Sequence, residues 1–269
     1  MKKIKKIGVF DSGLGGLFIA QSIRKHLPAY DYVYLGDTLN MPYGQRSDAD
    51  IYNLSENAMR YLIAKGCDLI VVACNTASAA ALRKLQQGFL AHEHPEKRIL
   101  GVVVPTLEAA IDSGATNIGM MATSRTVQSK IYDMELKKIN PAIHLHAIAT
   151  PLLTPLIEYN GAKYMEMVLE DYLAPLKAKK VETIILGCTH YVAIKDKVSK
   201  IMGDGVHVMS QDDIVPQKLG DYLIRHPDME ERLSTGGIFD IHATDTNENF
   251  TKNVTDIVGG DIGLTTARY

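Results

Sequence analysis

The feature that most constrains the fold is a regular alternation of short, wholly apolar runs with longer segments of helical period. The runs are rich in β-branched residues and predict strands at 6–10, 32–36, 69–73, 99–103, 117–121, 144–148, 183–186 and 206–209. Amphipathic segments lie between them, one starting near Gly15 and another covering 49–65. Strands that are apolar throughout suit a parallel sheet covered by helices on both faces. The β-α-β-α order therefore predicts a doubly wound α/β fold.

The chain also contains two comparable halves. Residues 69–76 read LIVVACNT and residues 184–191 read IILGCTHY, so that each apolar strand ends in Cys and small polar residues. The 269 residues correspond to roughly 1.8 domains at about 150 residues per domain. We therefore expect two lobes, each presenting a cysteine at a strand end. The segment from Ser234 onward predicts loops and one last helix that packs back on the first lobe.

Composition excludes several classes of protein. Apolar residues make up 46% and charged residues 22%, and the formal net charge is −2, which gives no sign of a nucleic-acid partner. The three cysteines, at 67, 74 and 188, are too few for a secreted disulfide framework. The apolar runs fall far short of the about 20 residues of a membrane-spanning helix, and the N-terminal run is too short for a signal peptide. We expect a cytoplasmic protein without a membrane partner.

Polar side chains follow three of the predicted strands. Since ligands of parallel sheets bind beyond the carboxyl ends of strands, these positions are candidates for a functional site: Asp11-Ser12-Gly13, Cys74-Asn75-Thr76 and Cys188-Thr189-His190. A helix N-terminus lowers the pKa of a thiol, and His190 can exchange a proton with Cys188 or with a substrate. A single free cysteine is usually a small buried apolar residue, but two at equivalent strand ends favour catalysis. Cys67 lacks this context and is assigned to the core.

The turn DSGLGG at 11–16 leads from a strand into a helix. Its glycines let backbone amides approach an anion at the helix N-terminus. Neither nucleotide-binding motif is complete, because Leu14 stands where a P-loop needs Lys and Phe18 stands where a dinucleotide fingerprint needs Gly or Ala. Asp37, after the second strand, has the place of a ribose-binding acid. A nucleotide-binding regulatory module therefore stays open as an alternative of a different class.

Histidine pairs at 92/94 and 144/146 have a spacing that suits metal ligands, but no nearby Cys or acid completes a zinc set. We expect no metal site and assign these histidines to structural or solvated positions. No G-x-S-x-G motif is present, which argues against an ordinary serine hydrolase.

The segment 150–159, TPLLTPLIEY, ends one strand and starts a helix. The pattern places Glu158 early in that helix, where an acidic residue is favoured by the helix dipole.

Four motifs in this order, D-S-G-L-G-G at 11–16, P-Y-G at 42–44, A-C-N-T-A-S at 73–78 and G-C-T-H-Y at 187–191, resemble the glutamate racemases of the cofactor-independent aspartate/glutamate racemase superfamily. The resemblance implies two pseudo-symmetric doubly wound lobes with mainly parallel sheets and an active site in the cleft between them. We place the first lobe at 1–104 plus about 212–269 and the second at about 105–211. The resemblance also implies that glutamate is the substrate, that no cofactor is needed, that the protein is a homodimer, and that it supplies D-glutamate for peptidoglycan.

The same resemblance implies roles for individual residues. Cys74 and Cys188 would be the two catalytic acid/base groups, assisted by Asp11 and His190, with Glu158 as a third helper. The substrate contacts would come from Asp11, Ser12, Tyr43, Gly44, Asn75, Thr76, Thr189 and His190. Two groups suit a racemase because the α-proton leaves one face of the carbon and returns to the other. An aspartate racemase or another amino-acid racemase of the same superfamily remains the nearest alternative.

Overall fold

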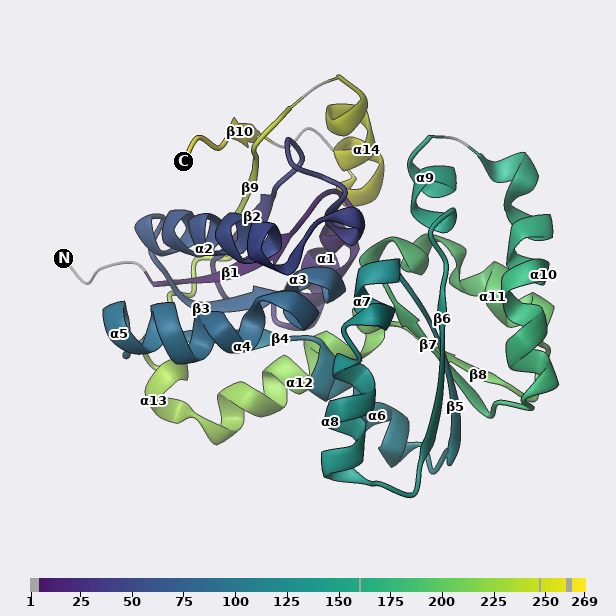
Figure 1. The fold of residues 1–269 in the computed structure, drawn as a ribbon. Helices are drawn as coiled ribbons and strands as arrows, with labels where there is room; N and C mark the ends of the chain where they lie inside the picture. Colours follow the sequence, from purple (N-terminus) through teal and green to yellow (C-terminus); the bar gives the residue numbers. More distant parts are fainter. Residues whose placement is uncertain (1–4, 160, 247, 260–262) are drawn as a thin grey trace.

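The computed structural model describes residues 5–159, 161–246, 248–259 and 263–269. Within them the chain forms two sheets that lie side by side and whose strand pairs are all parallel (Figure 1). The six-stranded sheet contains β1 (Lys6–Asp11), β2 (Tyr32–Gly36), β3 (Cys67–Val72), β4 (Arg98–Gly101), β9 (Phe239–Ala243) and β10 (Leu264–Thr266). The four-stranded sheet contains β5 (Asn117–Ala122), β6 (His144–Ala149), β7 (Thr183–Gly187) and β8 (His207–Met209). The predicted α/β fold with two mainly parallel sheets is confirmed.

All eight predicted strands are present, with two differences of note. The strand predicted at 99–103 ends at Gly101, and a helix begins at Val103. The prediction of only loops and one helix after Ser234 is wrong, because β9 and β10 extend the first sheet there. The sequence of β9, FDIHA, alternates apolar with polar residues and carries Asp, which has low strand propensity. The tail does pack back on the first sheet, since β9 pairs with β2.

The two sheets share one strand order. The first runs β2-β1-β3-β4 in its core and the second runs β6-β5-β7-β8. Their registers also correspond, since Phe10 pairs with Val72 and Met121 pairs with Leu186. Cys74 and Cys188 each follow those strand residues by two positions, so they are equivalent in the internal repeat. Both lie beside the point where the strand order reverses, where parallel sheets bind ligands.

Helices cover both faces of the first sheet. They are α1 (Gly16–His26), α2 (Asp48–Ala64), α3 (Asn75–Ala80), α4 (Leu82–Lys84), the π-helical segment η2 (Leu85–Leu90), α5 (Ala91–Glu93), α12 (Gln211–Arg225), α13 (Pro227–Glu230) and α14 (Glu248–Val258), with the 3₁₀ turn η1 (Tyr43–Gln45) in a loop. The core on one face takes side chains from α1, α12 and α14, and the core on the other takes them from α2, α3 and η2. The predicted helices near Gly15 and at 49–65 correspond to α1 and α2.

The second sheet is covered in the same way. Its elements are α6 (Val103–Asp112), α7 (Ser124–Gln128), α8 (Ile131–Ile139), α9 (Leu153–Glu158), α10 (Ala162–Ala178), the 3₁₀ segment η3 (Thr189–Ile194) and α11 (Lys195–Met202). One core contains side chains of α9, α10, η3 and α11, and the other contains side chains of α6 and α8.

The chain passes between the two sets of cores at two points. Val102 packs in a core of the first sheet, whereas Val103 packs in a core of the second. On the return, Ile214 packs with the second sheet and Val215 with the first. The first turn of α12 therefore belongs to one half of the molecule and the rest of the helix to the other.

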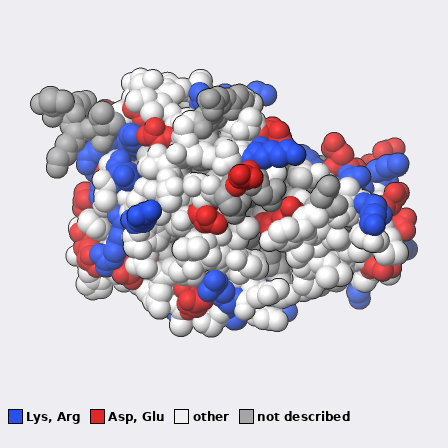
Figure 2. Space-filling model, turned by 90° about the horizontal axis from the view of Figure 1, so that it is seen from above, with Lys and Arg blue, Asp and Glu red and all other residues white. Residues whose placement is uncertain are grey.

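Charged residues of both signs share the surface. Figure 2 shows Lys and Arg side chains interspersed with Asp and Glu over one face of the molecule. Across the part of the chain that the structure describes, no helix is long and apolar enough to cross a membrane.

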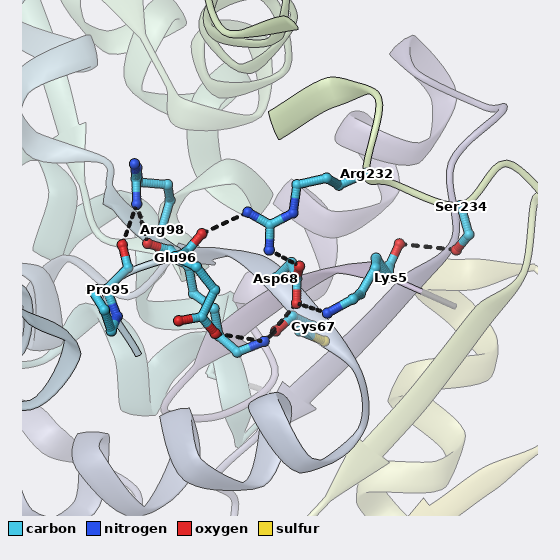
Figure 3. A network of polar contacts seen from close by, with 9 residues as sticks. Lys5, Cys67, Asp68, Pro95, Glu96, Arg98, Arg232 and Ser234 are labelled. Carbon is cyan, nitrogen blue, oxygen red and sulfur yellow. Dashed lines mark hydrogen bonds and ion pairs between the residues drawn. The ribbon is translucent and has the colours of Figure 1, made fainter. Parts of the chain in front are cut away.

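A network of charged groups lies at the amino-terminal ends of the strands of the first sheet, opposite to the end that carries Cys74 (Figure 3). The Asp68 side chain, at the start of β3, is fully buried and pairs with Lys5 at 3.0 Å, with Lys97 at 2.5 Å and with Arg232. These cations come from the residue before β1, the residue before β4 and the residues after α13. The network ties three distant segments together at the end of the sheet away from both strand-end cysteines.

Candidate active site

A cavity of about 130 Å³ lies between the carboxyl ends of the two sheets. Nearly all of the predicted site residues line it: Ser12, Tyr43, Gly44, Cys74, Asn75, Thr76, Glu158, Cys188, Thr189 and His190. Asp11 is fully buried and lies behind this wall, within hydrogen-bond distance of Thr189. The structure thus brings together residues far apart in the chain, such as Asp11 and His190, which are separated by 179 positions.

Cys74 is the N-cap residue of α3 and is 5% exposed. Its Sγ lies 3.4 Å from the Ala77 backbone N–H and 3.4 Å from the Ser12 hydroxyl. Burial and the charge of Asp11 raise the pKa of this thiol from the ordinary 9.0 to about 12, and the two hydrogen bonds offset only part of that rise. The expectation that the helix N-terminus lowers the pKa is therefore wrong for Cys74, because desolvation and a neighbouring carboxylate dominate.

Backbone N–H groups of the glycine turn at 11–16 bind a side chain of the protein itself. The Asp11 carboxylate accepts the Gly13 N–H at 3.1 Å, and burial raises the pKa of this carboxyl even though His190 and the Gly16 N–H lower it. A Cβ atom on Gly15 would stand 2.4 Å from the Thr189 hydroxyl, so this glycine permits contact between the two halves. The turn therefore does not present the open anion site that its sequence predicts.

Cys188 lies in a row of ionisable groups. Its Sγ is 3.8 Å from His190 Nδ1 and 3.8 Å from the Thr154 hydroxyl. His190 Nε2 lies 2.7 Å from Glu158 Oε1, in ion-pair contact but out of line for a hydrogen bond. Burial lowers the pKa of His190, yet Cys188 and Glu158 together raise it well above 6.5. The row favours a protonated imidazole between a sulfur atom and a carboxylate.

Glu158 occupies a different helical position from the one predicted. It is the last residue of α9, which spans only Leu153–Glu158, and not a residue of a first turn. Two prolines in the segment obscure where the helix begins. The helix dipole therefore does not explain this acid, and its contact with His190 does.

The loop between β2 and α2 is held by Asp37. This carboxylate is fully buried and accepts hydrogen bonds from the Tyr43 hydroxyl at 2.6 Å, the Thr244 hydroxyl at 2.8 Å and the Asn40 amide at 3.0 Å. It faces the protein interior and cannot serve as a ribose-binding acid. With the glycine turn also filled, the nucleotide-binding alternative loses both features that supported it.

Hydroxyl groups bridge the two halves at the cavity. Thr76 Oγ1 lies 2.9 Å from Thr123 Oγ1, and a Cβ on Gly44 would meet the Thr123 Cβ at 3.1 Å. Several residues that were not predicted from the sequence also line the cavity: Met41, Thr123, Ser124, Thr150, Thr154 and Tyr159. Thr123 follows β5 directly, so the strand-end rule that found Ser12 and Cys74 would have found it as well.

The histidine pairs do not form a metal centre. His146 contacts Asn117 at 2.9 Å and His92 contacts the Gly88 carbonyl at 2.6 Å. Within residues 5–159, 161–246, 248–259 and 263–269, no group of three or more His, Cys, Asp or Glu side chains is arranged to hold a metal ion.

Comparison with known proteins agrees with this arrangement. A sequence model of the family described as Asp/Glu/Hydantoin racemase matches residues 18–211, which is most of the chain. The chain belongs to the Asp/Glu/hydantoin racemase family. The family match spans both of the strand-end cysteines and reaches the first residue of α12.

Within this family, the similar proteins compared below are glutamate racemases. The chain is 38% identical to a glutamate racemase of Jannaschia sp. (strain CCS1) over 237 residues, covering 83% of this chain and 86% of the relative. The crystal structure of a glutamate racemase from Bacillus anthracis superposes with a TM-score of 0.90 at 28% identity, covering 99% and 98% of the two chains. That of Francisella tularensis, in complex with D-glutamate, gives 0.87 at 27% identity over 100% and 98%.

Proposed function

We propose that this chain is a glutamate racemase, an isomerase that interconverts L-glutamate and D-glutamate. Its family membership and its glutamate racemase relatives support this assignment. The observation that carries it is that Cys74 and Cys188, from equivalent strand ends of two sheets, line a single cavity. Two proton-transfer groups on opposite sides of one small ligand are the requirement of two-base racemisation.

In the proposed reaction, one cysteine thiolate removes the α-proton and the other cysteine thiol donates a proton to the opposite face. The Cα–H bond breaks first, as one sulfur takes the proton and leaves the bonding electron pair on Cα. A new Cα–H bond then forms with the proton of the other sulfur. The two sulfur atoms therefore exchange protonation states in each turnover. Asp11 assists Cys74, since its charge acts on that thiol. His190 assists Cys188, since its ring nitrogen lies 3.8 Å from the sulfur, with Glu158 behind it.

The raised pKa of Cys74 indicates when its thiolate forms. A buried thiol beside a carboxylate stays protonated at neutral pH. The α-ammonium group of a bound amino acid brings a positive charge into this cavity and favours the thiolate. Deprotonation of Cys74 is therefore coupled to substrate binding.

Neutral hydrogen-bond donors would hold the two substrate carboxylates. None of the described residues lining the cavity is Lys or Arg, whereas Ser12, Thr76 and Thr189 supply hydroxyls and the α3 turn supplies backbone amides. Fixed donors in a dry site stabilise the charge that develops as the α-proton leaves. Tyr43, Gly44, Asn75 and His190 complete the proposed set of substrate contacts that line the cavity. Asp11, which the resemblance also implies as a contact, is fully buried behind them.

The proposal extends to the organisation of the molecule and its cellular role. Two lobes, at 1–104 plus about 212–269 and at about 105–211, would close on the substrate; the exchange of core at Val102/Val103 and at Ile214/Val215 supports these limits. By its resemblance to glutamate racemases, we propose that the protein is cytoplasmic, forms a homodimer and uses no cofactor. Its proposed role is to supply D-glutamate for peptidoglycan. Sedimentation of the purified protein tests the dimer.

Circular dichroism of L-glutamate and D-glutamate solutions incubated with the purified protein tests the activity. We expect both to decay to zero ellipticity, and we expect Cys74→Ala and Cys188→Ala to abolish the decay. Cys67→Ala is the matched control, because Cys67 is also buried but lies at the start of β3 and does not line the cavity. Decay of aspartate but not glutamate would favour the alternative substrate, and full activity of either active-site variant would refute the two-cysteine assignment.

A further inference from the structure

Behind the cavity lies a cluster of four buried polar side chains, Asn75, Thr106, Tyr132 and Gln211, which we call the Asn75 cluster. Each member is at most 2% exposed. Asn75 Oδ1 accepts hydrogen bonds from the Tyr132 hydroxyl at 2.6 Å and from Gln211 Nε2 at 2.7 Å, and Asn75 Nδ2 donates to Gln211 Oε1 at 2.7 Å. Both polar atoms of the Asn75 side chain are thus bound within the protein.

The cluster joins segments that belong to different halves. Asn75 begins α3 of the first half, whereas Tyr132 lies on α8 and packs in a core of the second. Gln211 is the first residue of α12, in the turn where the chain returns from the second half to the first. Gln211 Nε2 also lies 3.5 Å from the hydroxyl of Thr106, on α6, which follows the outward crossing.

The attached turn carries Cys74. Asn75 is the next residue in the chain, and the Ala77 N–H of the same turn donates to the Cys74 sulfur. On the other side of this turn, Thr76 contacts Thr123 of the second half. The position of Cys74 relative to the second half is therefore fixed by side-chain contacts on both sides of the turn.

We propose that Gln211 and Tyr132 are positioning residues that act through Asn75 to hold Cys74 at its reacting distance from the substrate. The inference rests on the proposed function and assigns roles to two side chains that do not line the cavity. A shift of about 1 Å at a reacting group costs up to about 100-fold in rate. Loss of either side chain should therefore lower kcat by about 10- to 100-fold and change KM much less.

A distinctive isotope effect follows from this role. The two enantiomers have equal free energy, so a variant must lose kcat/KM equally in both directions. Displacing Cys74 nonetheless slows only the proton transfer at Cys74. For the enantiomer whose α-proton Cys74 removes, the primary deuterium isotope effect on kcat/KM should rise. For the other enantiomer it should fall, because Cys188 then breaks the Cα–H bond in a step that reverses before product forms.

The test compares Tyr132→Phe and Gln211→Met with Tyr32→Phe, using α-deuterated L- and D-glutamate. Tyr32 is a matched control, since it is fully buried and its hydroxyl also makes a 2.6 Å hydrogen bond, to the Leu27 carbonyl in the first core. We expect the two isotope effects to move in opposite directions in the Asn75 cluster variants and to stay at the wild-type values in Tyr32→Phe. Tyr132→Phe removes a single oxygen atom, so it keeps the test available if Gln211→Met does not fold.

Isotope effects that stay at the wild-type values in folded cluster variants would overturn the inference, as would a change in both enantiomers in the same direction. A wild-type protein that does not racemise glutamate would instead overturn the proposed function. The two failures are thus distinguished by the wild-type assay alone.

Discussion

Cys74 and Cys188 occupy the same position in two sheets of identical core strand order, yet their ionisable neighbours differ. By the strand registers, Asp11 of the first half and Ala122 of the second half hold equivalent positions in the internal repeat. The registers likewise place His190 of the second half at the position of Thr76 in the first. Cys74 therefore faces a carboxylate and Cys188 faces an imidazole. A symmetric scaffold with asymmetric helpers predicts that the two thiols respond differently to the same perturbation.

The charge of Asp11 should govern the reactivity of Cys74. Because this carboxylate raises the pKa of the Cys74 thiol, Asp11→Asn should lower that pKa and increase the thiolate fraction at about pH 9. Alkylation of Cys74 by iodoacetamide, followed by peptide mass spectrometry, should then be about tenfold faster than in wild type. Alkylation of Cys67, in the same samples, reports any general loosening of the fold. An unchanged or slower rate at Cys74 would contradict the assigned electrostatics.

Glu158 should stabilise the fold in a pH-dependent manner through His190. A histidine whose folded-state pKa lies well above 6.5 adds stability below its unfolded pKa and loses that contribution as pH rises through the folded pKa. Glu158→Gln should therefore lower the free energy of unfolding by about 1–3 kcal/mol near pH 6. The difference from wild type should shrink at alkaline pH. Urea unfolding across this range tests the prediction, and a deficit that is constant with pH would argue against a protonated His190.

Thr244 should influence substrate affinity from outside the cavity. Its hydroxyl donates to the buried Asp37 carboxylate, which also holds the Tyr43 hydroxyl and so fixes the loop that lines the cavity. Thr244→Val leaves that carboxylate short of a donor, at a cost of about 1–3 kcal/mol, and should raise KM about tenfold. Thr246→Val is the control, because its hydroxyl contact with Thr266 is exposed. Equal KM values in the two variants would contradict a role of Asp37 in substrate affinity.

The Asp68 network should contribute to stability but not to chemistry. Although burial raises the pKa of Asp68, hydrogen bonds from Lys97 and Lys5 lower it below its ordinary value. Asp68→Asn leaves the buried Lys97 and the partly exposed Lys5 and Arg232 without their partner. It should cost about 3–5 kcal/mol at neutral pH, with kcat of the folded enzyme unchanged. The gap between variant and wild type should begin to narrow below about pH 4, where Asp68 of the unfolded chain takes up a proton, and should close as the pH falls through the lowered folded-state pKa. Asp240→Asn, which breaks the more exposed pair with Lys6, should cost about 1 kcal/mol or less.

The sequence predicted the strands that carry the site because these strands are buried on both faces and therefore apolar throughout. Strand β9 escaped prediction because its FDIHA pattern is mixed, and its place in the sheet depends on pairing with β2. The cysteines, Asp11 and His190 could be found because they follow strands directly. The contacts of Gln211 and Tyr132 could not, since they depend on how the two halves meet. The contact of Asp37 with Thr244 could not either, since it joins residues 207 positions apart in the chain.

Electrostatics was the least predictable property of the site. The position of Cys74 at a helix N-terminus predicts a lowered pKa, and that position is correct. Burial and the Asp11 charge outweigh the helix contribution and raise the pKa instead. The distance from Asp11 to Cys74 is set by two adjacent strands, β1 and β3, and local sequence patterns contain no measure of it.

Transfer of the α-proton between two separate groups is the central claim, and isotope incorporation tests it most directly. L-glutamate is incubated with the enzyme in deuterium oxide, and both enantiomers are separated early in the reaction and analysed by mass spectrometry. Two cysteines on opposite faces predict that the D-glutamate product carries α-deuterium while the remaining L-glutamate does not. Deuterium that enters product and remaining substrate equally would show that a single group handles both faces.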